Sequence, residues 1–393
     1  MKKFMLMAAT VMMSLAANAQ SSPEAKAIKK LKTYAEVEAA FKASGSAMSN
    51  EDKAFCYNKL AELAKKESDA AEKAAIEAQL AKNEAGSAEL TTKKNEMAYA
   101  ALANSAEAYA LNEKSMKLGD NLQTLRNSMV QAGLDSYNAK NYAGAQKYFG
   151  MFVETRKAPL FSKVDFSGEQ NFGQVCYYAA LAAYFNKDGK KCSEYADAAL
   201  ASGEKDITND VITVKLGALE TMAQDKSMDT AQYINEVKKV YDANPDNEGV
   251  FGKLVGLYDD SGNKAGAKAL LDSRLAQNPN DAMANAYVGQ NAQSEGNYPE
   301  AIAAYTKAVQ AKPDFLPAKL NLGVCYLNKA AADIDANTDA RGNVKADKKA
   351  GIVEDLNKAK SILEEVKAAD PDKLQVNWSY PLERVNYALD NVK

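Results

Sequence analysis

Histidine is absent from this chain of 393 residues, and that absence excludes more chemistry than any other feature of its composition. A Ser-His-Asp triad, a Cys-His pair and a His-ligated metal site all require the imidazole ring. Cysteine and tryptophan are also scarce: the chain has four cysteines and one tryptophan. The 49 basic and 52 acidic residues leave a formal charge of −3, and no basic block marks a nucleic-acid or anionic-membrane contact.

The usual catalytic motifs are missing as well. The sequence contains no GxSxG, no phosphate-binding loop and no GxGxxG after a strand. Two carboxylates suffice for glycan hydrolysis, but here the carboxylates fall on expected solvated helix faces without a candidate cleft. We therefore expect no enzyme, and no catalytic, cofactor-binding or metal-binding residues. A carboxylate-based glycan hydrolase is the less favoured alternative.

Residues 1–19 have the pattern of a secretory signal peptide. Lys2 and Lys3 precede a short apolar segment, and Ala17 and Ala19 place small residues at the positions that signal peptidase recognises. A membrane anchor is the weaker interpretation, because a span needs about 20 apolar residues. We expect cleavage before Gln20 and a soluble, exported protein, either periplasmic or secreted, without a membrane span.

A 34-residue period organises the second half of the chain. Pro245, Pro279 and Pro313 recur at this spacing, and Ala267 precedes Pro279 by the same interval as Ala301 precedes Pro313. Proline ends a helix, because it lacks an amide hydrogen and clashes with the preceding turn. A small residue lets another helix cross closely. The period therefore predicts a series of helical hairpins.

The units of this period resemble the tetratricopeptide repeat, whose pattern is W-x2-L-G-x2-Y…A-x3-F…P. The L-G-x2-Y motif is intact at Leu322, Gly323 and Tyr326, while the aromatic residue at the first position is mostly missing. In such a hairpin we expect Gly289 at the close helix crossing and Tyr305 in the groove towards the next hairpin. The resemblance implies an all-α, right-handed α-solenoid.

The domain order follows from where the period is visible. We expect a signal peptide (1–19), a non-repeat helical N-terminal region (20–117), a solenoid of about six hairpins (118–371) and a C-terminal capping helix (372–393). The segment from Tyr326 to Ala359 is much longer than the equivalent segment from Tyr258 to Ala267, which predicts an extended hairpin near 330–353 with a polar tip near Gly342. Residues 64–95 fit either one long exposed helix or a pair broken at residues 67–69.

The first helices of successive hairpins line a concave face in such solenoids. The candidate partner-binding residues expected there are Val130, Leu134, Tyr137, Tyr177, Leu181, Tyr184, Gln290 and Gln293. Aromatic side chains offer a large contact area with a polar handle. Aromatic stripes at helical spacing are more often core. Two interpretations remain: the tyrosines bind a protein segment, or the N-terminal helices fold back and cover them.

The whole chain resembles exported tetratricopeptide-repeat proteins of Gram-negative envelopes. This wider likeness is carried by the signal peptide, by Ala-Pro-Leu-Phe at 158–161 and by Trp-Ser-Tyr-Pro-Leu at 378–382. It implies a non-catalytic interaction scaffold or adaptor that binds a peptide or helix of an unknown protein partner, without a cofactor or nucleic acid. The alternative is a self-associating structural envelope protein, which would form a homo-oligomer.

The four cysteines are scattered, and each lies where a small core residue belongs. Cys176 and Cys192 are the only local candidates for a disulfide. We expect all four thiols to be buried and free. Titration of the unfolded, unreduced protein should therefore count four thiols, and a count of two would show that a disulfide had formed.

Overall fold

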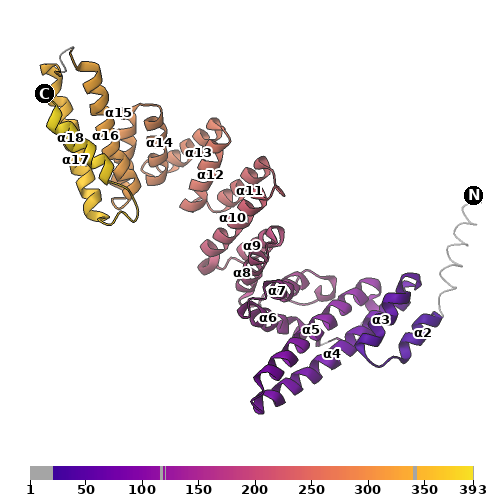
Figure 1. The fold of residues 1–393 in the computed structure, drawn as a ribbon. Helices are drawn as coiled ribbons and strands as arrows, with labels where there is room; N and C mark the ends of the chain where they lie inside the picture. The colour runs from indigo at the N-terminus through magenta and orange to yellow at the C-terminus, as the bar shows by residue number, and fades with distance from the viewer. Residues whose placement is uncertain (1–20, 116–117, 120, 340–342, 393) are drawn as a thin grey trace, which may run out of the picture. The chain divides into compact units, whose positions relative to one another are not determined.

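The computed structural model describes residues 21–115, 118–119, 121–339 and 343–392 (Figure 1). The predicted signal peptide and its cleavage site before Gln20 lie outside these residues. Within the described ranges the regular structure is helical, apart from one isolated β-bridge between Thr338 and Val344. The all-α helical-repeat fold expected from the sequence is confirmed. The chain divides into two compact units, residues 1–229 and 230–393, which we describe separately.

Unit 1 begins with four helices that lack the 34-residue period. They are α2 (Pro23–Lys30), α3 (Tyr34–Ser44), α4 (Asn50–Leu80) and α5 (Glu84–Leu111). α4 and α5 lie side by side as a long antiparallel pair (Figure 1). Ser49 caps α4 by accepting a hydrogen bond from the amide of Asp52. Half of the residues buried in α4 and α5 are alanines, whose small side chains let the two axes approach closely.

Neither of the two arrangements considered for residues 64–95 is found as stated, because α4 continues through residues 67–69 to Leu80 and a second helix, α5, begins at Glu84. Ser68 is buried there, and its hydroxyl donates a hydrogen bond to the carbonyl of Lys94 in α5. The turn comes later. Lys82 adopts a φ of 57°, and the side chain of Asn83 accepts the amide hydrogen of Gly86 to start α5.

The rest of unit 1 is built from packed helix pairs. Its elements are η2 (Glu113–Ser115), α6 (Asn121–Asn138), α7 (Tyr142–Thr155), η3 (Pro159–Phe161), α8 (Phe172–Phe185), α9 (Gly189–Ala201), η4 (Lys205–Ile207) and α10 (Thr208–Gln224). α6 packs against α7, α8 packs against α9, and α10 packs against both α8 and α9. η3 contacts α5 and buries Leu160 and Phe161. The Ala-Pro-Leu-Phe stretch thus joins the repeat helices to the N-terminal pair.

In unit 2, the first residues of successive repeat helices follow the 34-residue period of the sequence. Its elements are α11 (Thr230–Ala243), α12 (Glu248–Asp260), α13 (Lys264–Gln277), α14 (Ala282–Ser294), α15 (Tyr298–Ala311), α16 (Leu316–Asn337), α17 (Ala346–Ala369) and α18 (Ser379–Asn391). The first helices α12, α14 and α16 begin at the same interval as the prolines of the sequence period. α16 and α17 are longer than the other helices of unit 2 and carry additional residues between Tyr326 and Ala359. Gly342, expected at their tip, lies outside the described residues.

Three first helices carry a glycine where the second helix of the pair lies against them. A Cβ at that glycine would approach the opposing side chain to 2.5 Å at Gly133 and Phe149, and to 2.9 Å at Gly289 and Tyr305 and at Gly323 and Leu363. No ordinary side chain fits at such a distance, so glycine sets the separation of the helices. Tyr305 also belongs to a buried cluster with residues of α16, and it therefore fills the groove towards the next pair as expected.

All four cysteines are buried and free of disulfides, in line with the sequence analysis. Burial raises the pKa of Cys176, Cys192 and Cys325 to about 12. Their thiols therefore stay protonated at neutral pH and behave as small apolar core groups.

α18 packs on α17 at the end of unit 2. Trp378, directly before this helix, is buried, and its indole N–H donates to the carbonyl of Asp370 at 2.7 Å. The Asp370 carboxylate accepts hydrogen bonds from the amides of Val376, Gln375 and Leu374, which lower its pKa. One acidic residue thus fixes the turn that brings the only tryptophan and the last helix onto the solenoid.

Replacing Gly289 with leucine should lower the free energy of unfolding by about 1–3 kcal/mol, because the added side chain overlaps the ring of Tyr305. Urea denaturation followed by circular dichroism measures this change. Gly256 is the matched control, since it lies in α12 with nothing within 4 Å of an added Cβ. Gly256→Leu should instead raise stability slightly, by up to about 1 kcal/mol, because leucine favours a helix more than glycine does and nothing opposes the added side chain. Equal effects of the two substitutions would contradict the close crossing at Gly289.

Candidate partner-binding surface

The eight candidate residues fall on three first helices. Val130, Leu134 and Tyr137 belong to α6, and Tyr177, Leu181 and Tyr184 belong to α8, both in unit 1; Gln290 and Gln293 belong to α14 in unit 2. None of the eight is fully buried. The six residues of unit 1 form one candidate surface, and the two glutamines are considered apart from it.

Aromatic rings from α6, α7 and α8 come together on unit 1. The residues Tyr137, Tyr142, Tyr177, Tyr178, Tyr184 and Phe185 are called the aromatic surface below. Tyr137 has its ring centroid 5.5 Å from that of Tyr142, 6.1 Å from that of Tyr178 and 6.3 Å from that of Phe185. Phe185 also stacks on Tyr142 at 4.8 Å. Edge-to-face and stacked pairs of this kind contribute about 0.5–1.5 kcal/mol each beyond area burial.

The aromatic surface is graded from half-buried to exposed. Tyr137 and Tyr177 pack partly against the core of unit 1, and burial raises the pKa of both hydroxyls. Tyr184 is 40% exposed and Phe185 is 46% exposed. The N-terminal helices therefore do not cover the outer part of the aromatic surface. The surface continues to α10, where a Cβ at Gly217 would lie 3.2 Å from the ring of Tyr184.

Sequence analysis missed three members of the aromatic surface. These are Tyr142, at the start of α7, and Tyr178 and Phe185, which directly follow the predicted residues Tyr177 and Tyr184. The signal was the pair of adjacent aromatics at 177–178, which recurs at 184–185 on the same helix. This interval is close to two helical turns, so both pairs present their rings on the same side of α8.

The two glutamines of α14 have different surroundings. Gln293 accepts a hydrogen bond from the hydroxyl of Tyr305 at 3.0 Å, so it acts within its own hairpin. Gln290 is exposed and lines a cavity of about 480 Å³, together with residues of α12, α13 and α15. Half of the other lining residues are charged, among them Asp259 and Lys268. A role of the two glutamines in partner binding stays a prediction.

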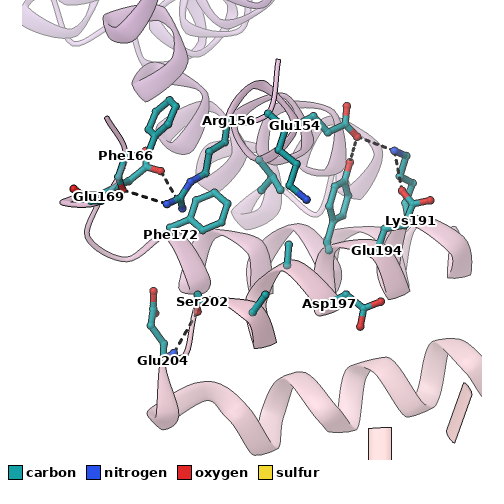
Figure 2. Close-up of a pocket in the computed structure, with 16 residues that line it drawn as sticks. Glu154, Arg156, Phe166, Glu169, Phe172, Lys191, Glu194, Asp197, Ser202 and Glu204 are labelled. Atoms are coloured by element: carbon teal, nitrogen blue, oxygen red, sulfur yellow. Dashed lines mark hydrogen bonds and ion pairs between the residues drawn. The ribbon is translucent and has the colours of Figure 1, made fainter. Parts of the chain in front are cut away.

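A larger cavity of about 790 Å³ lies between α7, α9 and the loop that joins α7 to α8 (Figure 2). The guanidinium of Arg156 lies over the ring of Phe172, 3.9 Å from its centroid, and donates a hydrogen bond to the carbonyl of Phe166. On the α9 side, Glu154 accepts hydrogen bonds from Lys191 at 2.8 Å and from the hydroxyl of Tyr195 at 2.9 Å. These polar groups satisfy one another, which leaves little unpaired chemistry for a ligand.

A buried arginine holds the loop that forms this cavity. Arg126 of α6 is fully buried, stacks on Phe152 with 3.8 Å to the ring centroid, and pairs with Glu169 in the loop. The same carboxylate lies 3.5 Å from Arg156. Two guanidinium groups thus converge on one carboxylate. Sequence analysis did not foresee this contact, because Arg126 and Glu169 lie far apart in a stretch without a clear period.

The part of the chain that the structure describes contains no group of three or more His, Cys, Asp or Glu residues placed to hold a metal ion. Among the same residues, no helix combines the length and apolarity needed to cross a membrane.

No protein-family model matches the chain, and no curated protein matches it in sequence. Solved structures do match, and they include tetratricopeptide-repeat proteins, the family that the sequence resembles. A TPR repeats protein from Bacteroides fragilis is 19% identical, with a TM-score of 0.35, over 67% of this chain and 98% of its own. A monomeric IFIT1 mutant with Gppp-AAAA is 14% identical, with a TM-score of 0.37, over 95% and 72%. The TPR2AB-domain:pHSP90 complex of yeast Sti1 is 14% identical, with a TM-score of 0.26, over 81% and 98%.

Glu169→Gln should destabilise the protein by about 3 kcal/mol or more, because it leaves the buried charge of Arg126 without its partner. Chemical denaturation gives the free-energy change, and limited proteolysis should show faster cleavage within residues 157–171. The control is Glu113→Gln, which removes an exposed pair with Lys163 and should cost less than about 1 kcal/mol. A loss no larger than that of the control would show that Glu169 does not hold the loop.

Proposed function

We propose that this chain is a non-catalytic scaffold of the cell envelope that captures a peptide or helix of another protein on the aromatic surface. The observation that carries this proposal is the exposure of Tyr184 and Phe185 beside rings that are already packed against one another. Export to the periplasm or beyond is part of the proposal and rests on the sequence pattern of residues 1–19.

The aromatic surface has the properties of a binding hot spot. Aromatic side chains bury large areas, and truncating such an anchor costs about 2 kcal/mol or more in binding. Contact with Tyr142 and Tyr137 already restricts the ring of Phe185, so less side-chain entropy is lost when a partner binds. The tyrosine hydroxyls provide hydrogen bonds at the rim, and the phenylalanine provides an apolar centre. Affinity would therefore come from apolar anchors more than from charge.

The test is crosslinking in the intact envelope followed by mass spectrometry, with the double variant Tyr184→Ala and Phe185→Ala. Both side chains are about half-exposed, and the variant also removes ring contacts of Phe185 with Tyr137 and Tyr142, so it should remain folded with a moderately lower melting temperature and lose its crosslinked partners. Tyr387→Ala is the control, since this residue is 71% exposed on α18 in unit 2. Unchanged crosslinks in the double variant would refute the proposal, as would a large loss of stability without a change in partners.

Self-association is the second candidate function, favoured by the exposed face of α18. Tyr380 is 64% exposed, and Arg384 lies over its ring, on the same helix as Tyr387. Size-exclusion chromatography with light scattering separates the two candidates. A discrete oligomer that Tyr387→Ala dissociates would favour a structural role, and a monomer would favour the scaffold.

A further inference from the structure

The rings of the aromatic surface form a continuous strip along α8 and the end of α6. Tyr177 contacts Tyr178 with 5.9 Å between ring centroids, and Tyr184 contacts Phe185 at 5.7 Å. Tyr137 of α6 joins the two pairs, because its ring lies 6.1 Å from that of Tyr178 and 6.3 Å from that of Phe185. The strip therefore offers two aromatic pairs that are seven residues apart on one helix.

The spacing of the two pairs matches the pitch of a polyproline II helix. Seven residues of α-helix rise about 10 Å. One turn of polyproline II has three residues and rises about 9 Å. Side chains on one edge of such a segment would meet the first aromatic pair and, one turn later, the second. Two turns of an α-helical partner match this interval as well, so the polar groups of the strip decide between the two.

The tyrosine hydroxyls of the strip favour a partner with free backbone carbonyls. No residue that the structure describes makes a hydrogen bond to the hydroxyls of Tyr137, Tyr177 and Tyr184. By contrast, the buried Tyr305 donates to Gln293 at 3.0 Å. A polyproline II segment has no internal hydrogen bonds, so its carbonyls can accept from these hydroxyls. The carbonyls of an α-helix are already bonded within the helix, so a helical partner would cover the hydroxyls and leave them without acceptors.

Proline-rich composition suits the strip better than other extended sequences. Proline fixes φ at about −65°, so the segment is ordered before it binds and loses less entropy on binding. Proline also lacks an amide hydrogen, so no backbone donor is left unpaired against the rings. Aromatic-lined surfaces are a known way of recognising such segments.

The two ends of the strip carry charges of opposite sign. Asp210 of α10 is exposed and forms no ion pair with a residue that the structure describes. Burial and then the charge of Asp210 raise the pKa of the Tyr177 hydroxyl, which places this carboxylate at the Tyr177 end. At the other end Lys187, which closely follows Phe185, is likewise exposed and unpaired within the described ranges, while Asp188 beside it already accepts two hydrogen bonds. A segment with one basic and one acidic end complements both charges.

We infer that the aromatic surface binds a proline-rich protein segment in the polyproline II conformation, with a basic residue of the segment beside Asp210 and an acidic residue beside Lys187. This inference rests on the proposed function, since it names the class of segment that the scaffold captures. The segment lies along α8. Its prolines pack on the two aromatic pairs, and its carbonyls accept hydrogen bonds from the tyrosine hydroxyls.

The test is isothermal titration of the intact chain with blocked synthetic peptides. The peptide KPPLPPLPPE has the proposed chemistry and should bind. KGGLGGLGGE keeps the charges and leucines but does not favour polyproline II, so it should bind about tenfold more weakly or less tightly still. EPPLPPLPPE brings a like charge to Asp210 and should bind about threefold more weakly. The helical peptide KLLEELKKLLEE represents the other class of segment and should not bind.

Two substitutions separate the contributions of the hydroxyl and the charge. Tyr177→Phe keeps the ring and removes an unpartnered hydroxyl, so it should weaken the binding of KPPLPPLPPE about fivefold without lowering the melting temperature. Asp210→Asn should abolish the preference for KPPLPPLPPE over EPPLPPLPPE. The matched controls are Tyr387→Phe and Asp246→Asn, which alter exposed residues of unit 2 and should change neither value.

The inference would be overturned if KGGLGGLGGE bound as tightly as KPPLPPLPPE, if only the helical peptide bound, or if neither Tyr177→Phe nor Asp210→Asn had an effect. A dimer in light scattering that Tyr184→Ala with Phe185→Ala dissociates would assign the aromatic surface to a second copy and overturn it as well. Its failure is distinct from that of the proposed function. If no proline-rich peptide bound while the same double variant still lost its crosslinked partners, the scaffold would stand and the proline-rich class would be excluded.

Discussion

The closeness of the two helices in the three repeat pairs that cross at a glycine is the constraint on which the rest of the structure depends. Gly289 leaves room for the ring of Tyr305, and Gly133 does the same for Phe149. The second helix then supplies one large side chain, which fills the space that the glycine of the first helix leaves open. The two helices therefore pack closely, without a void between them. Because these contacts use the inner faces of the helices, the outer faces of α6 and α8 remain available. The aromatic surface is built on those faces together with Tyr142 at the start of α7.

Much of the fold could be predicted from the sequence, because repeat contacts are local. Gly289 and Tyr305 belong to one hairpin, and the regular spacing of the prolines identifies that hairpin without knowledge of the rest. The turn at Lys82 could not be predicted in the same way. Its position depends on an Asn83 side-chain cap and on Ser68 bonding across to α5, and residues 67–69 have the same turn-like composition.

The functional residues also differ in whether they depend on local repeat contacts or on contacts between distant parts of the chain. Tyr137 and Tyr184 follow from the period, because the residues after the small position of a first helix project away from its partner. The Arg126 and Glu169 pair is hidden from the sequence, because the two residues lie far apart in the chain and only the packing of the loop against α6 brings them together. Long-range contacts of polar residues leave no periodic signal.

The central claim is that closely packed helix pairs bury one set of aromatic residues and leave another set open to solvent. Hydroxyl-radical footprinting of the native protein, read by mass spectrometry, tests both halves of this claim together. We predict fast labelling of Tyr184 and Phe185 and strong protection of Phe149 and Tyr305. Equal protection of all four rings would contradict the account, since it would place the aromatic surface inside the core.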